Sequence, residues 1–146
     1  MNARRLLLAF VAGFMATLVF HQGALALLHA LGATDRTAFM TTPTKPFGVP
    51  QVLSLAFWGG VWGVILAALL RTARAGVGYY LTAFVLGAVL PTLVAFFVVA
   101  PLKDLPVAGG GDPKIIIGAL ILNGLWGLGT ALFLRVFGGQ RVSPSA

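Results

Sequence analysis

The chain has 146 residues, of which 59% are hydrophobic and only 9% are charged, and its mean hydropathy is +0.99. In soluble domains about a quarter of the residues are charged, so this composition excludes a soluble globular protein and indicates an integral membrane protein. Ten Lys and Arg residues against three Asp give a net charge of +7, which in a membrane protein reflects topology and attraction to anionic headgroups rather than nucleic-acid binding.

Four apolar stretches are long enough to cross a bilayer core about 30 Å thick, which needs about 20 apolar residues. The sequence therefore predicts an all-α fold, an integral membrane four-helix bundle, in a single transmembrane domain over residues 1–146. One hairpin covers about 6–72, a second covers about 76–137, and a short polar tail covers 138–146. The predicted spans run from about Leu6 to Ala30, Gln51 to Leu70, Val77 to Ala100 and Ile115 to Val136.

The first span has two interpretations. Arg4 and Arg5, the apolar run after them and the Ala-Leu-Ala of residues 24–26 also fit a cleavable signal peptide. A retained helix is favoured because the apolar run continues past the usual length of a signal peptide's hydrophobic region.

The positive charges predict the orientation of the spans, because Lys and Arg gather in cytoplasmic segments. Six lie on the side of the termini and four lie on the other side, so both termini are predicted to be cytoplasmic. The six are Arg4, Arg5, Arg71, Arg74, Arg135 and Arg141, and the four are Arg36, Lys45, Lys103 and Lys114.

An internal repeat relates the second span to the fourth. A shift of 64 residues aligns WGGVWGVILAALLR at 58–71 with LNGLWGLGTALFLR at 122–135, and a shift of 74 aligns AFVAG at 9–13 with AFVLG at 83–87. We predict a parallel duplication of a two-helix hairpin, with the copies related by an axis along the membrane normal. The alternative is independent use of small residues in packed helices.

Small residues four positions apart occur in every span, and such spacing lets two helix backbones approach closely in lipid. Trp62 and Trp126 lie near mid-bilayer, where they are expected to fill space beside glycines and to find acceptors for their indole N–H groups. The same small faces could also support a homo-oligomer or a larger membrane complex. The predicted helix-packing residues are Gly13, Gly59, Gly60, Gly63, Trp62, Gly87, Gly124, Trp126 and Gly127.

Several polar side chains fall within the extracytoplasmic half of the spans, where polar groups are candidates for a functional site. Pro91 adds a backbone carbonyl that lacks its helical donor. The alternatives are that these groups hydrogen-bond across helices and hold the bundle together, or that they contact lipid. The candidate binding residues are His21, Gln22, Ser54, Trp58, Thr92 and Asn123.

No catalytic, metal or cofactor motif is found, and the absence of cysteine excludes disulfides, thiolate metal sites and thiol catalysis. We therefore expect no enzyme, no cofactor and no metal site. Gly109–Gly111 are expected to form a flexible link, with Asp112 capping the fourth span and Pro113 in its first turn. Residues 41–51 are expected to be a surface connection, with a lid over the polar residues as the alternative.

Two strings, VFHQGALALLHA at 19–30 and PFGVPQVLSLAFWGGVWG at 46–63, resemble small uncharacterised bacterial inner-membrane proteins. This resemblance implies a four-span protein of the bacterial cytoplasmic (inner) membrane. It brings no activity, cofactor or site residue.

Three functions remain open from the sequence. The first is a non-enzymatic accessory, assembly or structural component of a membrane complex or homo-oligomer, which the packing signals favour. The second is a small transporter, channel or binding protein for a neutral or weakly polar solute, using the polar residues named above. The third is binding of a haem, quinone or lipid by His21 with the midplane tryptophans. The expected partner in every case is the lipid bilayer, with no nucleic acid.

Overall fold

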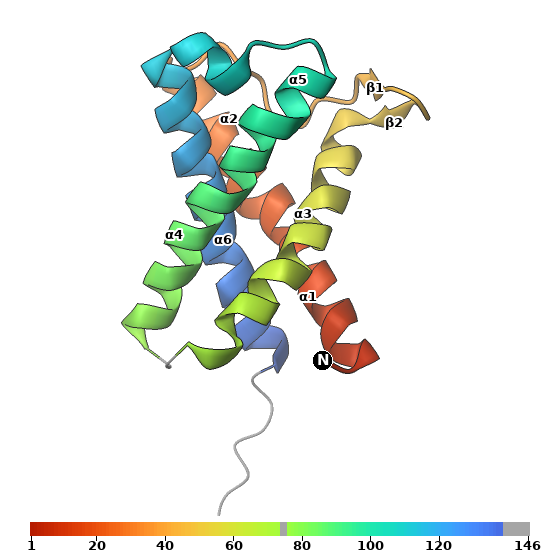
Figure 1. The fold of residues 1–146 in the computed structure, drawn as a ribbon, viewed down its shortest axis with the longest axis vertical. Helices are drawn as coiled ribbons and strands as arrows, with labels where there is room; N and C mark the ends of the chain where they lie inside the picture. Colours follow the sequence, from red (N-terminus) through yellow and green to blue (C-terminus); the bar gives the residue numbers. More distant parts are fainter. Residues whose placement is uncertain (74–75, 139–146) are drawn as a thin grey trace, which may run out of the picture.

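The computed structural model describes residues 1–73 and 76–138 (Figure 1). Arg74, Arg141 and the predicted polar tail after residue 138 lie outside the described residues. In chain order the elements are α1 Ala3–Ala16, the π-helical η1 Thr17–His21, α2 Gln22–Ala30, strands β1 Pro43–Thr44 and β2 Val49–Pro50, α3 Gln51–Leu69, the 3-10 turn η2 Leu70–Thr72, α4 Val77–Val94, the π-helical η3 Ala95–Val99, α5 Ala100–Leu102, the 3-10 turn η4 Val107–Gly111 and α6 Pro113–Gly138.

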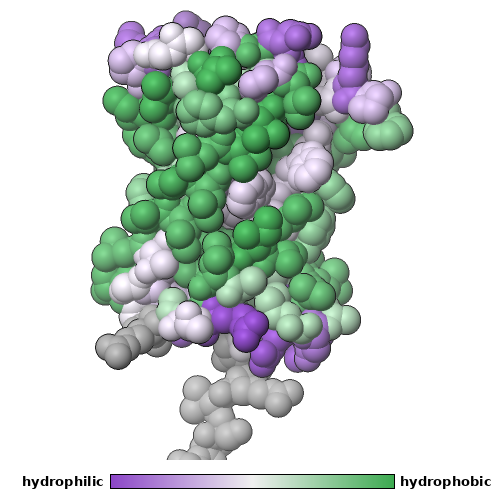
Figure 2. All heavy atoms as spheres, viewed as in Figure 1, coloured by the Kyte–Doolittle hydropathy of each residue, from purple (hydrophilic) through white to green (hydrophobic). Residues whose placement is uncertain are grey.

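Four continuous helical stretches among the described residues are long and apolar enough to cross a membrane: Ala3–Ala30, Gln51–Thr72, Val77–Leu102 and Pro113–Gly138. A broad apolar band separates two hydrophilic ends (Figure 2). The predicted all-α bundle is confirmed. The N-terminus and the end of α6 lie at one end of the bundle, here named the terminal end, and the loops before α3 and α6 lie at the other, here named the loop end (Figure 1).

The connections at the loop end contain features that the sequence did not predict. The loop after α2 forms a two-stranded antiparallel hairpin in which Thr44 pairs with Val49, and Phe47 at its tip is 87% exposed. The glycine-rich link before α6 makes a left-handed turn, with positive φ from Ala108 to Gly111. After it, the Asp112 side chain accepts a hydrogen bond from the Lys114 backbone N–H at 2.8 Å, which is the predicted cap.

Backbone contact at glycine joins α1 to α3. A Cβ atom added to Gly63 would lie 2.6 Å from the Ala9 carbonyl oxygen and 2.8 Å from the Gly13 Cα. One added to Gly60 would lie 2.6 Å from the Phe10 ring. At Gly63 the two backbones meet directly, so only a residue without a side chain fits there, and at Gly60 the Phe10 ring occupies the space of a side chain.

The contact between α4 and α6 uses the residues at the corresponding positions. A Cβ atom added to Gly127 would collide with the Ala83 carbonyl oxygen and lie 2.9 Å from the Gly87 Cα, and one added to Gly124 would lie 2.6 Å from the Phe84 ring. A shift of 74 residues relates α1 to α4, and a shift of 64 residues relates α3 to α6. By these shifts the contacts between α4 and α6 correspond residue for residue to those between α1 and α3.

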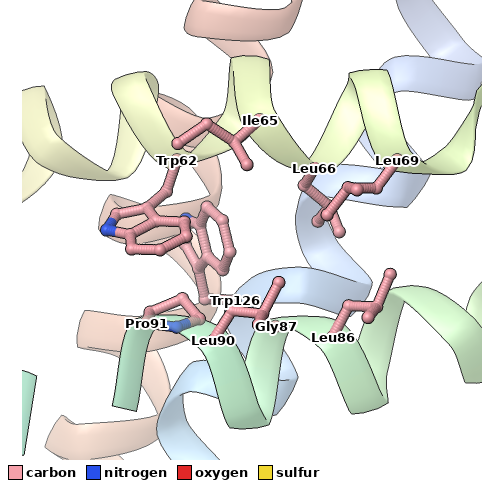
Figure 3. Close-up of a pocket in the computed structure, with 9 residues that line it drawn as sticks. All are labelled: Trp62, Ile65, Leu66, Leu69, Leu86, Gly87, Leu90, Pro91 and Trp126. Atoms are coloured by element: carbon pink, nitrogen blue, oxygen red, sulfur yellow. The ribbon is translucent and has the colours of Figure 1, made fainter. Parts of the chain in front are cut away.

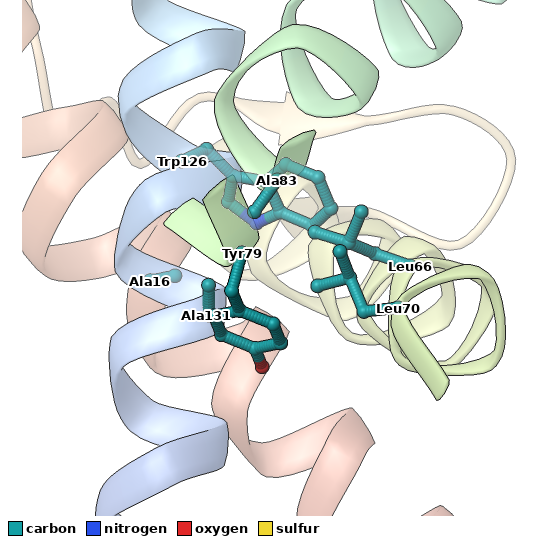
Figure 4. Packing of buried hydrophobic residues seen from close by; sticks show 7 residues of the cluster. All are labelled: Ala16, Leu66, Leu70, Tyr79, Ala83, Trp126 and Ala131. Atoms are coloured by element: carbon teal, nitrogen blue, oxygen red, sulfur yellow. The ribbon is translucent and has the colours of Figure 1, made fainter. Parts of the chain in front are cut away.

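The two hairpins meet along an α1–α6 seam and an α3–α4 seam. The α1–α6 seam is extensive, and in it Trp126 is 4% exposed and donates its indole N–H to the Gly13 carbonyl at 3.0 Å. The α3–α4 seam is much smaller. Its packed part lies toward the terminal end, where Leu66 and Leu70 join the buried cluster that holds Tyr79 (Figure 4). Between this cluster and the loop end, residues of α3 and of α4 line a cleft instead of packing closely.

The glycine contacts predict opposite outcomes for two substitutions in α6. Gly127→Ala places a methyl group against the α4 backbone, and overpacking of this kind costs about 1–3 kcal/mol of stability. Gly118→Ala is the matched control, because a Cβ atom there meets nothing within 4 Å and alanine raises helix propensity by up to about 1 kcal/mol. Thermal unfolding in detergent should show G127A destabilised and G118A unchanged or stabilised. Equal effects would contradict close backbone packing at Gly127.

Candidate functional site: a lateral cleft between α3 and α4

A cleft of about 620 Å³ lies between α3 and α4. Its volume lies within the range of about 300–1,000 Å³ that is usual for ligand sites. Pale, weakly polar side chains lie between the apolar surfaces of α3 and α4 in the view that faces this opening (Figure 2). Most of the wall is apolar, with Leu55, Val61, Ile65, Val94 and Val98 among its residues.

Polar side chains from three separate segments line this cleft. His21 comes from η1, Ser54 from α3 and Asn123 from α6, and Trp58 also lines it. The structure thus brings four of the six candidate binding residues together. The other two, Gln22 and Thr92, are buried and do not line the cleft, but each hydrogen-bonds to a residue that does.

A hydrogen-bonded chain from the loop sets the orientation of His21. The Phe39 backbone N–H donates to the Gln22 side-chain oxygen at 2.7 Å, so the Gln22 amide nitrogen faces the other way. That nitrogen lies 3.2 Å from His21 Nδ1 and donates to it, since an amide nitrogen can only donate. A neutral His21 therefore carries its proton on Nε2, which makes no hydrogen bond within the described residues. The ring presents an N–H donor in the cleft.

Asn123 is oriented in a similar way from α4. Its amide nitrogen donates to the Thr92 hydroxyl at 2.8 Å, and this leaves the Asn123 side-chain oxygen as an acceptor. Ser54, which can donate and accept, makes no side-chain hydrogen bond to any described residue. The cleft thus holds a donor, an acceptor and a group that can be either.

The two midplane tryptophans differ in their surroundings. Both line the deep end of the cleft and a second, water-sized cavity of about 10 Å³ below it (Figure 3). Trp126 has the acceptor that was predicted, the Gly13 carbonyl. Trp62 donates to no group among the described residues, and its indole nitrogen lies on the side away from Leu66 and Leu69, toward the loop end (Figure 3). Trp62 therefore adds a second N–H donor to the cleft.

Several lining residues were missed by the sequence analysis. Lys103 lines the cleft at the loop end, although in the sequence its charge served only to predict the orientation of the spans. Thr17, which also lines the cleft, donates its hydroxyl to the Gly13 carbonyl at 3.0 Å. A Thr side chain that bonds four residues back is known to bend helices, and here η1 begins at Thr17. The Gly-x-x-x-Thr spacing in the sequence is compatible with such a bond, but it does not by itself predict a π-helical turn.

The chemistry of the cleft suits binding of an uncharged group. Lys103 is the one charged side chain that lines it among the described residues, and it lies at the end of a span. No cluster of three or more His, Asp or Glu side chains that could hold a metal occurs in residues 1–73 and 76–138. The loop of residues 31–50 does not line the cleft, so the expected surface connection fits better than a lid.

The fold and the cleft together define the class of the protein, which is a multi-pass membrane protein with a lateral cleft. Comparison with known protein families, curated proteins and solved structures finds no match for this chain. The resemblance to bacterial inner-membrane proteins stays an expectation. The role of the cleft must therefore be argued from its own chemistry.

The orientation of His21 can be measured directly. Because the Gln22 amide donates to Nδ1, we expect nitrogen NMR of histidine-labelled protein to show His21 as the neutral Nε2–H tautomer. In Gln22→Leu this donor is lost, so the ring should populate both tautomers. The Phe39 N–H also loses its acceptor and should exchange faster with solvent. His29, whose Nδ1 lies 3.1 Å from the Thr34 carbonyl, is the internal control and should not change. An unaltered His21 signal in Q22L would contradict the hydrogen-bonded chain.

Proposed function

We propose that this protein binds, within the membrane, a molecule with a neutral or weakly polar group, and that the binding site is the cleft between α3 and α4. The observation that carries the proposal is the convergence of His21, Ser54 and Asn123, from three different segments, on one cleft of about 620 Å³. Unrelated polar contacts between helices would not need to share a cavity.

The hydrogen-bonding groups support a neutral ligand group. His21 and Trp62 can donate, Asn123 can accept and Ser54 can do either. A carbonyl or hydroxyl group could satisfy them without any charge being moved into the membrane, which is costly. Haem binding has no further support, because His21 Nδ1 already accepts from Gln22 and no second histidine lines the cleft among the described residues.

Binding is favoured over a channel by the packing below the cleft. At the terminal end of the cleft, Leu66 and Leu70 of α3 belong to the same buried cluster as Tyr79 and Ala83 of α4 (Figure 4). This cluster closes the space between the two helices on that side. The cleft therefore lies on the loop-end side of this cluster, and the packing of the cluster argues against a pore that runs the length of the bundle.

The accessory or assembly role, which the packing signals in the sequence favour, would place some small-residue faces against a partner. Gly13, Gly63, Gly87 and Gly127 are instead occupied by contacts within the chain. This leaves the cleft as the stronger support for a function, and a role in a larger complex would have to use other surfaces.

Four further statements belong to the proposal: the protein is not an enzyme, it lies in the bacterial inner membrane, both termini are cytoplasmic, and the two hairpins are copies of one ancestral hairpin. The duplication is supported by the matching contacts of Gly63 and Gly127. The orientation is supported by the sequence, in which six Lys and Arg residues fall in segments on the side of the termini and four fall in segments on the other side.

Native mass spectrometry of the protein extracted from its own membrane tests the binding proposal. We expect an added mass from a bound molecule on the unsubstituted chain, and a clear reduction of that mass in His21→Phe and in Asn123→Leu. Thr130→Val is the matched control, because Thr130 is a buried polar residue that does not line the cleft and whose hydroxyl donates to the Trp126 backbone carbonyl. A chain that carries no added mass, or equal retention in all three variants, would count against a ligand in the cleft.

A further inference from the structure

The cleft occupies the position of a seam that is closed on the other side of the bundle. In the repeat, α1 corresponds to α4 and α6 corresponds to α3, so the α1–α6 seam corresponds to the α3–α4 seam. Within these seams Trp126 corresponds to Trp62 and Gly13 corresponds to Gly87. Trp126 and Gly13 are joined by a hydrogen bond, whereas Trp62 and Gly87 only face a common cavity (Figure 3). The same scaffold is therefore packed on one side and open on the other.

A bulky residue helps to keep the α3–α4 seam open. In the closed seam Phe20 packs directly on Gly129, so closely that an added Cβ atom would collide with its ring. The residue that corresponds to Gly129 is Ile65, which is 40% exposed and lines the cleft together with Val94, the counterpart of Phe20. A branched side chain in place of glycine prevents the same close approach.

A second difference between the two seams concerns the hydrogen bonds at Gly13 and at its counterpart, Gly87. The Gly13 carbonyl accepts from the Thr17 backbone N–H, from the Thr17 hydroxyl and from Trp126. The counterpart of Thr17 is Pro91, which has neither a backbone N–H nor a hydroxyl. The Gly87 carbonyl therefore lacks the helical donors that the Gly13 carbonyl has, and Trp62 makes no hydrogen bond to it, in contrast to Trp126 and Gly13. The seam remains open to the membrane.

The groups along this opening follow the order of the parts of a membrane lipid. Lys103 lies at the loop end, where a charged headgroup would be. Ser54, in the first turn of α3, and His21, nine residues before the end of α2, lie between that end and the middle of the spans, and Trp62 and Ile65 lie near the middle of α3. Among the described residues Lys103 forms no salt bridge, so its ammonium group can meet an anion.

We propose that the ligand of the cleft is an anionic membrane lipid, whose acyl chain enters sideways between α3 and α4 and whose phosphate group meets Lys103. This inference rests on the proposed function and names its ligand class. The acyl chain occupies the part of the open seam that corresponds to the position of Phe20 in the closed seam. The ester carbonyls of the lipid accept a hydrogen bond from His21. The ligand reaches its site from the bilayer and not from water.

Tryptophan fluorescence can test the proposal, because brominated acyl chains quench a tryptophan that they touch. Trp58→Phe with Trp126→Phe leaves Trp62 as the reporter of the open seam. Trp58→Phe with Trp62→Phe leaves Trp126, at the same depth in the closed seam, as the matched control. Each variant is placed in vesicles of equal parts phosphatidylcholine and phosphatidylglycerol, and only one of the two lipids carries brominated chains. Exchange of the labelled lipid keeps the membrane composition constant.

We expect Trp62 to be quenched much more strongly than Trp126, and more strongly by phosphatidylglycerol than by phosphatidylcholine. One lysine near the surface predicts a preference of roughly fivefold for the anionic lipid. Lys103→Gln should remove this preference while quenching by both lipids persists. Equal quenching of Trp62 and Trp126, or an equal effect of the two lipids on Trp62, would overturn the proposal.

A measurement on the unsubstituted chain covers the case in which a double variant does not fold. After extraction from the same mixed vesicles, native mass spectrometry should retain phosphatidylglycerol in preference to phosphatidylcholine, and K103Q should lose that preference. If the chain from its own membrane instead carries a bound molecule that is not a lipid, the proposed binding function stands and the lipid inference fails. If the mass spectrum shows a dimer and Trp62 is shielded from quenching, a second copy fills the seam, which also overturns the inference.

Discussion

Backbone contact at glycine is the constraint on which the rest of the bundle depends. In lipid, an apolar side chain gains little by facing another helix rather than an acyl chain, so helices associate through close van der Waals contact and hydrogen bonds. Gly13 and Gly63 provide such contact between α1 and α3, and Gly87 and Gly127 provide it between α4 and α6. Each hairpin is thereby held as a unit by its own glycines. The way in which the hairpins meet is then decided by a few residues along the two seams.

The difference between the seams depends on hydrogen bonding as much as on volume. Trp126 brings its N–H to a carbonyl that already accepts from Thr17, and the three helical segments around Gly13 are thereby joined. An indole N–H and a carbonyl in the membrane both need partners, because there is no water to supply them. Pro91 and Ile65 stand at the corresponding positions of the other seam, where neither residue allows the same contacts. The two seams thus use the same kinds of helix and differ in side chains at a few positions.

The sequence predicted the helices and much of their packing, for physical reasons that are local. Length and hydropathy indicated the spans, the four-residue spacing of glycines indicated which faces meet, and counting depth from the charged ends grouped His21, Ser54 and Asn123. The open seam could not be predicted in this way. Ile65 and Gly129 are both acceptable residues in a membrane helix, and the difference between them matters only once Phe20 is known to pack on Gly129 and Val94 to line the cleft together with Ile65.

The π-helical segments and the role of Lys103 were missed for related reasons. A π-helical turn depends on how a backbone distortion is accommodated by neighbouring helices, which a single span does not reveal. Lys103 follows the last apolar residue of its span, so the sequence alone could not distinguish a loop charge from a residue beside a cleft. The β1–β2 hairpin was missed because each strand has only two residues and neither carries an apolar–polar alternation.

The loop after α2 contributes to the cleft without lining it. The backbone N–H of Phe39 is a donor that cannot change its role, so it determines which end of the Gln22 amide faces His21, and through that amide it determines which ring nitrogen carries the proton. With Nδ1 occupied, His21 offers the cleft a single neutral donor. A donor of this kind suits a carbonyl or ester oxygen, and it does not compensate an anion in a region where unpaired charge is costly. Among the described residues, the cation that lines the cleft is Lys103, near the end of the span. A ligand that satisfies both groups must carry its charge at the surface and its neutral oxygen atoms deeper in the membrane.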